Sequence, residues 1–249
     1  MNTENILFID IETVSGYSDF DQMPEEDRKF WSLKSRQLLT PEQHAQPERI
    51  AACYSDRAAI YAEYGKIICI SVGVMVRSKE SPATFRVKSF YGKDEKLLLE
   101  QLFELVELRY NDSNRTGFCG HNIREFDIPY ICRRAVIHGL KLPTSLHLMN
   151  KKPWEVKHIL DTLDMWKFGD HKHYISLALL AYLLDIPTPK DDIDGSMVGC
   201  VFWKEDDLDR IKTYCQKDVV TVAHVYTRLN NEEFVDVSEI HFIENQKQN

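Results

Sequence analysis

Long apolar runs, paired cysteines and an excess of positive charge are all missing from this sequence. No stretch of about 18 apolar residues could span a bilayer, and residues 1–5 lack the basic start and apolar stretch of a signal peptide. We therefore expect a cytoplasmic protein with no membrane association. The six cysteines form no CxxC pair and no spacing typical of zinc, so we interpret them as reduced, mostly buried thiols. A net charge of −8 argues against strong non-specific binding to duplex nucleic acid.

Hydrophobic periodicity predicts an α/β domain. The chain has 249 residues, 43% hydrophobic and 28% charged, which suits one large domain over residues 1–249 with an ample core. Strands are expected at residues 5–11, 66–76, 83–91, 116–119 and 158–163, the second and third forming a hairpin. Helices are expected at residues 97–110, 128–138, 175–184 and within 206–229. This order implies a mixed sheet with helices packed against it.

Two segments depart from that regular pattern. Residues 15–64 are polar and helical, with prolines at positions 24, 41 and 47, and we interpret them as a helical insertion after the first strand. We expect residues 232–249 to form a polar C-terminal tail. A few apolar side chains in that tail could dock on the domain: Phe234, Val235, Ile240, Phe242 and Ile243.

Two acids, Asp10 and Glu12, stand at the end of the first predicted strand, in the segment Ile6-Leu-Phe-Ile-Asp-Ile-Glu-Thr-Val14. Because they are two residues apart on a strand, both side chains leave the same face. Two acids that project together can jointly hold divalent cations. A strand end that emerges into solvent would explain the same pair without any ligand.

A third acid, Asp127, lies in the segment Gly120-His-Asn-Ile-Arg-Glu-Phe-Asp-Ile-Pro-Tyr130, where a short strand leads into a helix. An acid at such a position is commonly a helix cap. Its apolar neighbours, among them Phe126, Ile128 and Ile131, supply more bulk than a surface cap needs and favour a functional acid. Asp161 and Asp164 could also contribute to an acidic site, although the turn after the last strand explains them equally well.

Tyr214 and Asp218 are four residues apart and therefore neighbours on one face of the late helix. The tyrosine hydroxyl could hold a water beside a metal that Asp218 ligates, whereas a packed ring and a solvated acid would give the same spacing. Other positions of this helix, Cys215 among them, are expected in the core. A carboxylate beside an apolar run is costly unless it is paired or binds a metal. Four such acids with few cations nearby suggest a site for two divalent ions, of the kind that cleaves phosphodiesters.

The three segments together resemble the motifs of the DEDD exonucleases: D-x-E, then N-x-x-x-F-D, then Y-x-x-x-D. The tyrosine matches the DEDDy branch, which includes the proofreading 3′–5′ exonuclease domain of family B DNA polymerases. With no polymerase region, the chain resembles the stand-alone predicted exonucleases related to that domain. The resemblance spans roughly residues 5–230, least well over 15–64. It implies a ribonuclease-H-like fold, with a mixed five-stranded sheet flanked by helices.

The resemblance also implies a two-metal site. Asp10 would bridge two divalent cations, and Glu12 and Asp218 would complete one site. Asp127 would help to hold the second cation. Oxygen-rich sites of this kind favour Mg²⁺ or Mn²⁺.

Five further positions have implied roles toward water or substrate. Tyr214 would orient the attacking water, so we expect Tyr214→Phe to slow catalysis and leave some activity. The main chain near Thr13 and Val14 would lie against the terminal nucleotide. Asn122 and Phe126 would lie close to the substrate strand or support Asp127.

The implied function is a metal-dependent 3′–5′ exonuclease acting on single-stranded nucleic acid. It would remove nucleoside 5′-monophosphates from the 3′ end, with DNA as the favoured substrate and RNA as the alternative. A catalytically silent nucleic-acid-binding or assembly module that retains the fold is the rival interpretation. The sequence contains all five residues that the DEDDy motifs require, which weighs against this rival. They are Asp10, Glu12, Asp127, Tyr214 and Asp218.

Overall fold

A computed structural model of the chain describes residues 1–78, 82–170, 174–187 and 193–244. The strands in this part of the chain are β1 (Ile6–Ser15), β2 (Gly65–Val76), β3 (Thr84–Tyr91), β4 (Gly117–Gly120), β5 (Ile159–Asp161) and β6 (Ile240–Ile243). The α-helices are α1 (Glu25–Ser35), α2 (Pro41–His44), α3 (Pro47–Arg57), α4 (Glu95–Arg109), α5 (Asp127–Ile137), α6 (Thr162–Lys167), α7 (Leu177–Leu183), α8 (Val198–Cys200) and α9 (Leu208–Leu229). None of the helices in the described ranges is long and apolar enough to cross a membrane.

The strands form one mixed sheet in the order β5-β4-β1-β2-β3-β6. Strand β1 lies inside the sheet, antiparallel to β2 and parallel to β4, and β2 and β3 form the expected antiparallel pair. The outer strands β5 and β6 pair in parallel with β4 and β3. The prediction of a mixed sheet flanked by helices is therefore confirmed.

The described sheet has six strands, and the expectation of five was one short. The additional strand, β6, comes from the segment expected to be a polar tail and pairs with residues 85–88 of β3. Phe234, just before it, packs edge-on against Phe85 with ring centroids 5.2 Å apart. Four residues that include a histidine are too short to give a periodic signal in the sequence. The contact of Phe234 with Phe85 instead holds this segment beside β3.

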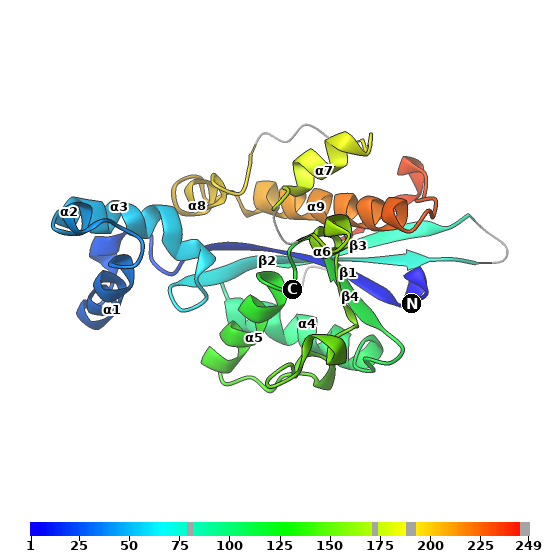
Figure 1. Cartoon of the computed structure of the whole chain (residues 1–249), viewed down its shortest axis with the longest axis horizontal. Coiled ribbons are helices and arrows are strands. Elements are labelled where there is room, and N and C mark those ends of the chain that lie inside the picture. Colours follow the sequence, from blue (N-terminus) through cyan, green and yellow to red (C-terminus); the bar gives the residue numbers. More distant parts are fainter. Residues whose placement is uncertain (79–81, 171–173, 188–192, 245–249) are drawn as a thin grey trace.

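Helices cover both faces of the sheet (Figure 1). Helices α4 and α5 lie on one face, and α7, α8 and α9 lie on the other. Side chains of β1 alternate between the two: Leu7, Ile9 and Ile11 join the core beneath α4 and α5, and Ile6 and Phe8 join the core beneath α9. A strand buried on both faces has a nearly continuous apolar sequence, which explains the run that starts this chain.

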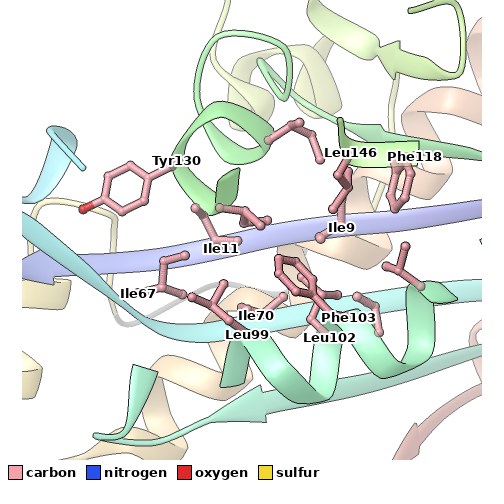
Figure 2. Packing of buried hydrophobic residues seen from close by; sticks show 14 of the residues in the cluster. Ile9, Ile11, Ile67, Ile70, Leu99, Leu102, Phe103, Phe118, Tyr130 and Leu146 are labelled. Carbon is pink, nitrogen blue, oxygen red and sulfur yellow. The ribbon is translucent and has the colours of Figure 1, made fainter. Parts of the chain in front are cut away.

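The core beneath α4 and α5 supports the end of β1 from below (Figure 2). Ile9 and Ile11 point into this layer, whose buried side chains are at most 7% exposed. Their neighbours include Ile67 and Ile70 of β2, Leu99, Leu102 and Phe103 of α4, and Tyr130 of α5. The packing holds rigid the strand on which Asp10 and Glu12 alternate with these isoleucines.

The segment between β1 and β2 folds as helices α1, α2 and α3, with a small core of its own. Trp31 and Tyr54 are fully buried there, with ring centroids 5.3 Å apart. Hydrogen bonds join this segment to both neighbouring strands: Thr13 Oγ1 of β1 donates to the Ala59 carbonyl at 2.9 Å, and the Gly65 N–H of β2 donates to the Tyr61 carbonyl at 2.8 Å. The helical elements therefore extend from the end of the strand that carries Asp10 and Glu12.

Candidate active site

Asp10 and Glu12 continue the face of β1 that is turned toward α9. Glu12 is 7% exposed and Asp10 is half-buried. One carboxylate oxygen of each lies within 4.8 Å of the other, so the two acids do project together. Pairing of β1 with β4 ends at Phe8, which leaves the next residues of β1 free of a strand on that side.

Helix α9 crosses this face and adds Tyr214, Cys215 and Asp218. The Tyr214 hydroxyl donates a hydrogen bond to the Asp218 carboxylate one turn further along the helix. The Cys215 thiol donates to Asp10, with Sγ 3.3 Å from Oδ2 and 3.5 Å from the main-chain carbonyl. The charge of Asp218 acts on both Asp10 and Glu12. The pattern Tyr-x-x-x-Asp thus faces the strand acids and is neither a merely packed ring nor a distant solvated acid.

Asp127 reaches the same place from the edge of β1. It is the first residue of α5 and 3% exposed, and the residue in the N-cap position is Phe126, whose side chain makes no capping bond. One oxygen of Asp127, Oδ1, accepts the Ile11 N–H at 3.1 Å. Because Ile11 lies between Asp10 and Glu12, this bond places the third acid beside the other two. The alternative that Asp127 only caps a surface helix does not fit its burial.

Asp161 organises the turn that leads to Asp127. Its carboxylate is 3% exposed and accepts three main-chain N–H groups: Asn122 at 2.9 Å, Arg124 at 3.1 Å and Leu163 at 2.9 Å. Asn122 has a left-handed φ of 62°, a conformation that asparagine tolerates better than most residues. Asp161 therefore acts on the site through the main chain of this turn.

Asp164 has a different and more peripheral place. It forms ion pairs with Arg124 at 3.2 Å and with Lys167 at 2.9 Å, and all three side chains are at least one-quarter exposed. It lies among surface charges and, unlike Asp161, supports no part of the acidic cluster.

The charge state of the cluster follows from burial and like-charge repulsion. Burial, and then the charges of Asp218, Glu12 and Asp127, raise the pKa of Asp10. Burial, and then Asp218, raise the pKa of Glu12. Burial also raises the pKa of Asp127 to about 7, although hydrogen bonds from the main chain oppose the shift. The same burial and nearby acids raise the pKa of the Tyr214 hydroxyl, which stays protonated.

Asp10, Glu12 and Asp127 form no ion pair with a basic side chain of the described residues. The Glu12 carboxylate is more than nine-tenths buried, and no donor among the described residues forms a hydrogen bond with it. Buried oxygens without a donor or a cation are the donor set that a divalent cation would complete.

The four candidate substrate-binding residues divide into two pairs. Thr13 directs its hydroxyl to the helical segment, at the Ala59 carbonyl, and the Val14 side chain is fully buried in the core. Asn122 and Phe126 are half-buried beside Asp127. Within the described ranges, no hydrogen bond reaches the Asn122 side-chain amide, and the Phe126 ring lies 5.4 Å from the Tyr130 ring. The structure therefore leaves Asn122 and Phe126 available as side chains, and Val14 only through its main chain.

Cys215 is the residue of this site whose part was missed from the sequence. Its position inside the Tyr-x-x-x-Asp pattern was assigned to the core, which is correct for its burial but omits its bond to Asp10. The available signal was the spacing alone: Cys215 lies three residues before Asp218, so the two side chains are neighbours on the helix surface.

Comparison with known proteins agrees with this geometry. A model of predicted 3′–5′ exonucleases related to the exonuclease domain of PolB matches residues 60–246. That range contains Asp127, Tyr214 and Asp218 and begins after Asp10 and Glu12. The sheet brings these two acids to the matched residues, because β1 pairs with β2 and β4 on its two sides.

Among solved structures, the chain is similar to the family B DNA polymerase from the hyperthermophilic archaeon Pyrobaculum calidifontis. The TM-score is 0.51 at 13% sequence identity, and the similarity covers 91% of this chain and 24% of the polymerase. This chain thus corresponds to about a quarter of that structure, and the expected ribonuclease-H-like fold is confirmed. No curated protein matches the sequence.

Proposed function

Because the chain belongs to the family of predicted 3′–5′ exonucleases related to the exonuclease domain of PolB, we propose that it hydrolyses single-stranded nucleic acid from the 3′ end. The products would be nucleoside 5′-monophosphates. The observation that carries the proposal is the Glu12 carboxylate, which is buried with no donor among the described residues and lies near the charges of Asp10, Asp127 and Asp218. A fold does not maintain such a cluster for its own stability.

The four carboxylates fit two divalent cations, Mg²⁺ or Mn²⁺. Asp10 would contribute to both, Glu12 and Asp218 to one, and Asp127 to the other. The raised pKa values of Asp10, Glu12 and Asp127 fit this assignment, since bound cations would supply the missing positive charge. When bound, such ions activate water and stabilise the charge that develops on the phosphate and on the departing 3′-oxygen.

The remaining residues would position the reactants. The Tyr214 hydroxyl, protonated and bonded to Asp218, can orient a water molecule without acting as a base. The side-chain amide of Asn122, which has no hydrogen-bond partner among the described residues, and the half-buried Phe126 ring lie beside Asp127, where a terminal nucleotide would be held. The main chain of Thr13 and Val14 would contact the same nucleotide from β1.

A silent module with the same fold is the second candidate. A protein that had lost catalysis would have no reason to keep four acids in mutual repulsion, since such repulsion destabilises the folded state. Neutral replacement of any one of them would relieve it. The intact cluster favours the enzyme.

The experiment is a cleavage assay on matched single-stranded DNA and RNA oligonucleotides, labelled at the 5′ end, with Mn²⁺ or with a chelator. We expect a ladder of products that shorten from the 3′ end with the metal and none with the chelator. A circular single strand serves as a control and should remain intact; its cleavage would indicate an endonuclease. Equal results from wild type and Asp10→Ala, with or without metal, would contradict the proposal.

A further inference from the structure

The acidic cluster contains a sulfur ligand in addition to its oxygens. One donor atom from each of Asp10, Glu12 and Cys215 lies within 4.8 Å of the other two. Cys215 is fully buried, and its sulfur is directed at Asp10 Oδ2, 3.3 Å away. Glu12 is 7% exposed and has no hydrogen-bond partner among the described residues. Three donors of this spacing can bind one cation at their centre.

The chemistry of these three donors differs from that of the four carboxylates. Mg²⁺ prefers oxygen ligands in octahedral geometry, whereas Zn²⁺ binds thiolate sulfur at about 2.3 Å and carboxylate oxygen at about 2.0–2.2 Å in tetrahedral geometry. Soft sulfur ligands select Zn²⁺ over Mg²⁺ and Mn²⁺. A site with two carboxylates and one thiol therefore favours a different cation from the one the nuclease reaction needs.

We propose that Asp10, Glu12 and Cys215 form a binding site for Zn²⁺ that competes with the catalytic cations for Asp10 and Glu12. On binding, the Cys215 S–H bond breaks and its proton passes to solvent. The sulfur electron pair then forms the bond to the metal, without any change of oxidation state. Three protein ligands leave the fourth tetrahedral position to water.

The site has two measurable consequences. The first, metal binding itself, is independent of any enzymatic activity. The second, inhibition, rests on the proposed exonuclease function: a cation held by Asp10 and Glu12 removes both from the reaction. Inhibition by Zn²⁺ should then depend on a residue, Cys215, that the Mg²⁺ or Mn²⁺ reaction does not use as a ligand.

Binding is tested with Cd²⁺, which shares the thiolate preference of Zn²⁺ and gives an ultraviolet absorption band when bound to sulfur. The full-length protein is freed of metal with a chelator and titrated with Cd²⁺. We expect a saturable band for wild type, its loss in Cys215→Ser, and displacement of the bound Cd²⁺ by Zn²⁺. Glu12→Gln should weaken binding by about 10-fold or more, since it removes one ligand.

Another cysteine provides the control. Cys200 is the exposed thiol, whereas Cys69 is unsuitable because its thiol is hydrogen-bonded to Cys215. Cys200→Ser should retain the band, with circular dichroism confirming that every variant is folded. A band that survives in Cys215→Ser, or that disappears in Cys200→Ser, would overturn the assignment.

Inhibition is tested by adding Zn²⁺ to the Mn²⁺-supported cleavage assay, with each variant compared with its own uninhibited rate. Half-inhibition of Cys215→Ser should require about 10–100-fold more Zn²⁺ than wild type. If wild type and Cys215→Ser were half-inhibited at the same Zn²⁺ concentration, the proposed competition between Zn²⁺ and the catalytic cations would be overturned. A protein that shows the Cd²⁺ band but cleaves no nucleic acid would support the metal site and contradict the exonuclease, so the two failures are distinguishable.

Discussion

Two buried glutamates, Glu95 and Glu12, are almost equally removed from solvent, at 5% and 7% exposure, yet have opposite surroundings. Glu95 accepts bonds from the Arg134 guanidinium at 2.5–3.0 Å, from His138 Nε2 at 2.7 Å and from the Ile67 N–H at 2.7 Å. Glu12 has no donor within the described ranges, and its charged neighbours are acids. The charge of Glu95 is thus compensated by donors of the fold, whereas the charge of Glu12 has no compensating donor among the described residues.

The difference separates a structural acid from a functional one. Removing a carboxylate from water costs several kcal/mol unless donors or cations replace the water. For Glu95 the replacement is built into the fold. For Glu12 the described residues supply no such replacement. We therefore expect a bound cation to supply it and the metal-free cluster to lower stability. Changes at the two places should therefore have opposite signs.

The largest effect is expected for Asp10→Asn. Loss of a shared metal ligand removes several kcal/mol of transition-state stabilisation, or roughly a thousandfold in rate. The metal-free protein should become more stable, by about 1 kcal/mol, because one of the mutually repelling charges is gone. Oligonucleotide cleavage and denaturant unfolding in chelator measure the two quantities. An Asp10→Asn variant that is both active and less stable than wild type would contradict the contrast between functional and structural acids.

Glu95→Gln should do the reverse. The Arg134 guanidinium would lose its carboxylate partner in a buried place, and the free energy of unfolding should fall by about 3–5 kcal/mol. Cleavage per folded molecule should be unchanged, because Glu95 has no contact with the acidic cluster. Pairing the change with Arg134→Met removes the stranded charge and should restore part of the stability. No recovery in the double variant would mean that packing, and not charge, sets the loss.

Asp161→Asn should have an intermediate effect that falls on metal binding. An amide presents one acceptor oxygen in place of two, so the N–H groups of Asn122, Arg124 and Leu163 can no longer all be satisfied. The turn before Asp127 would loosen, and the apparent affinity for Mn²⁺ should fall about 10–100-fold, as for other residues that hold a ligand in place. Raising the Mn²⁺ concentration should restore the rate.

Asp164→Asn is the matched control for that change. Asp164 forms only part-exposed ion pairs with Arg124 and Lys167, of the kind worth about 0–1 kcal/mol. Its Mn²⁺ dependence should remain that of wild type. An equal loss of apparent Mn²⁺ affinity in Asp161→Asn and Asp164→Asn would show that Asp161 acts through general stability and not through Asp127.

The same contrast explains what could be predicted from the sequence. The apolar run of β1, its two acids and the helical spacing of Tyr214 and Asp218 are local patterns, and each has a single geometric consequence. The placement of Asp127 needed more, since its burial depends on the Ile11 N–H, 116 residues earlier in the chain. There the bulky neighbours of Asp127 were the only local indication.

Features that depend on partners distant in the sequence could not be predicted in this way. Glu95 stands at the start of an amphipathic helix, where an acid is ordinary, and nothing local connects it with Arg134, 39 residues later. Asp161 acts through main-chain N–H groups, which carry no side-chain signature. Strand β6 is likewise defined by its pairing with β3 rather than by its own sequence.

The last expected effect is a pH dependence of stability that only the metal-free cluster should show. Burial raises the pKa of Asp127 from 3.8 to about 7, so between these values the folded protein holds a proton that the unfolded chain has released. The folded state then binds more protons, and stability falls as pH rises across that window, by at most about 1.4 kcal/mol per pH unit for one such group. Unfolding in chelator at several pH values measures the slope, with Asp127→Asn as the control that should lose this contribution. Saturating Mn²⁺ should abolish the fall, because a cation favours the deprotonated carboxylate; a slope unchanged by Mn²⁺ would mean that Asp127 is not among its ligands.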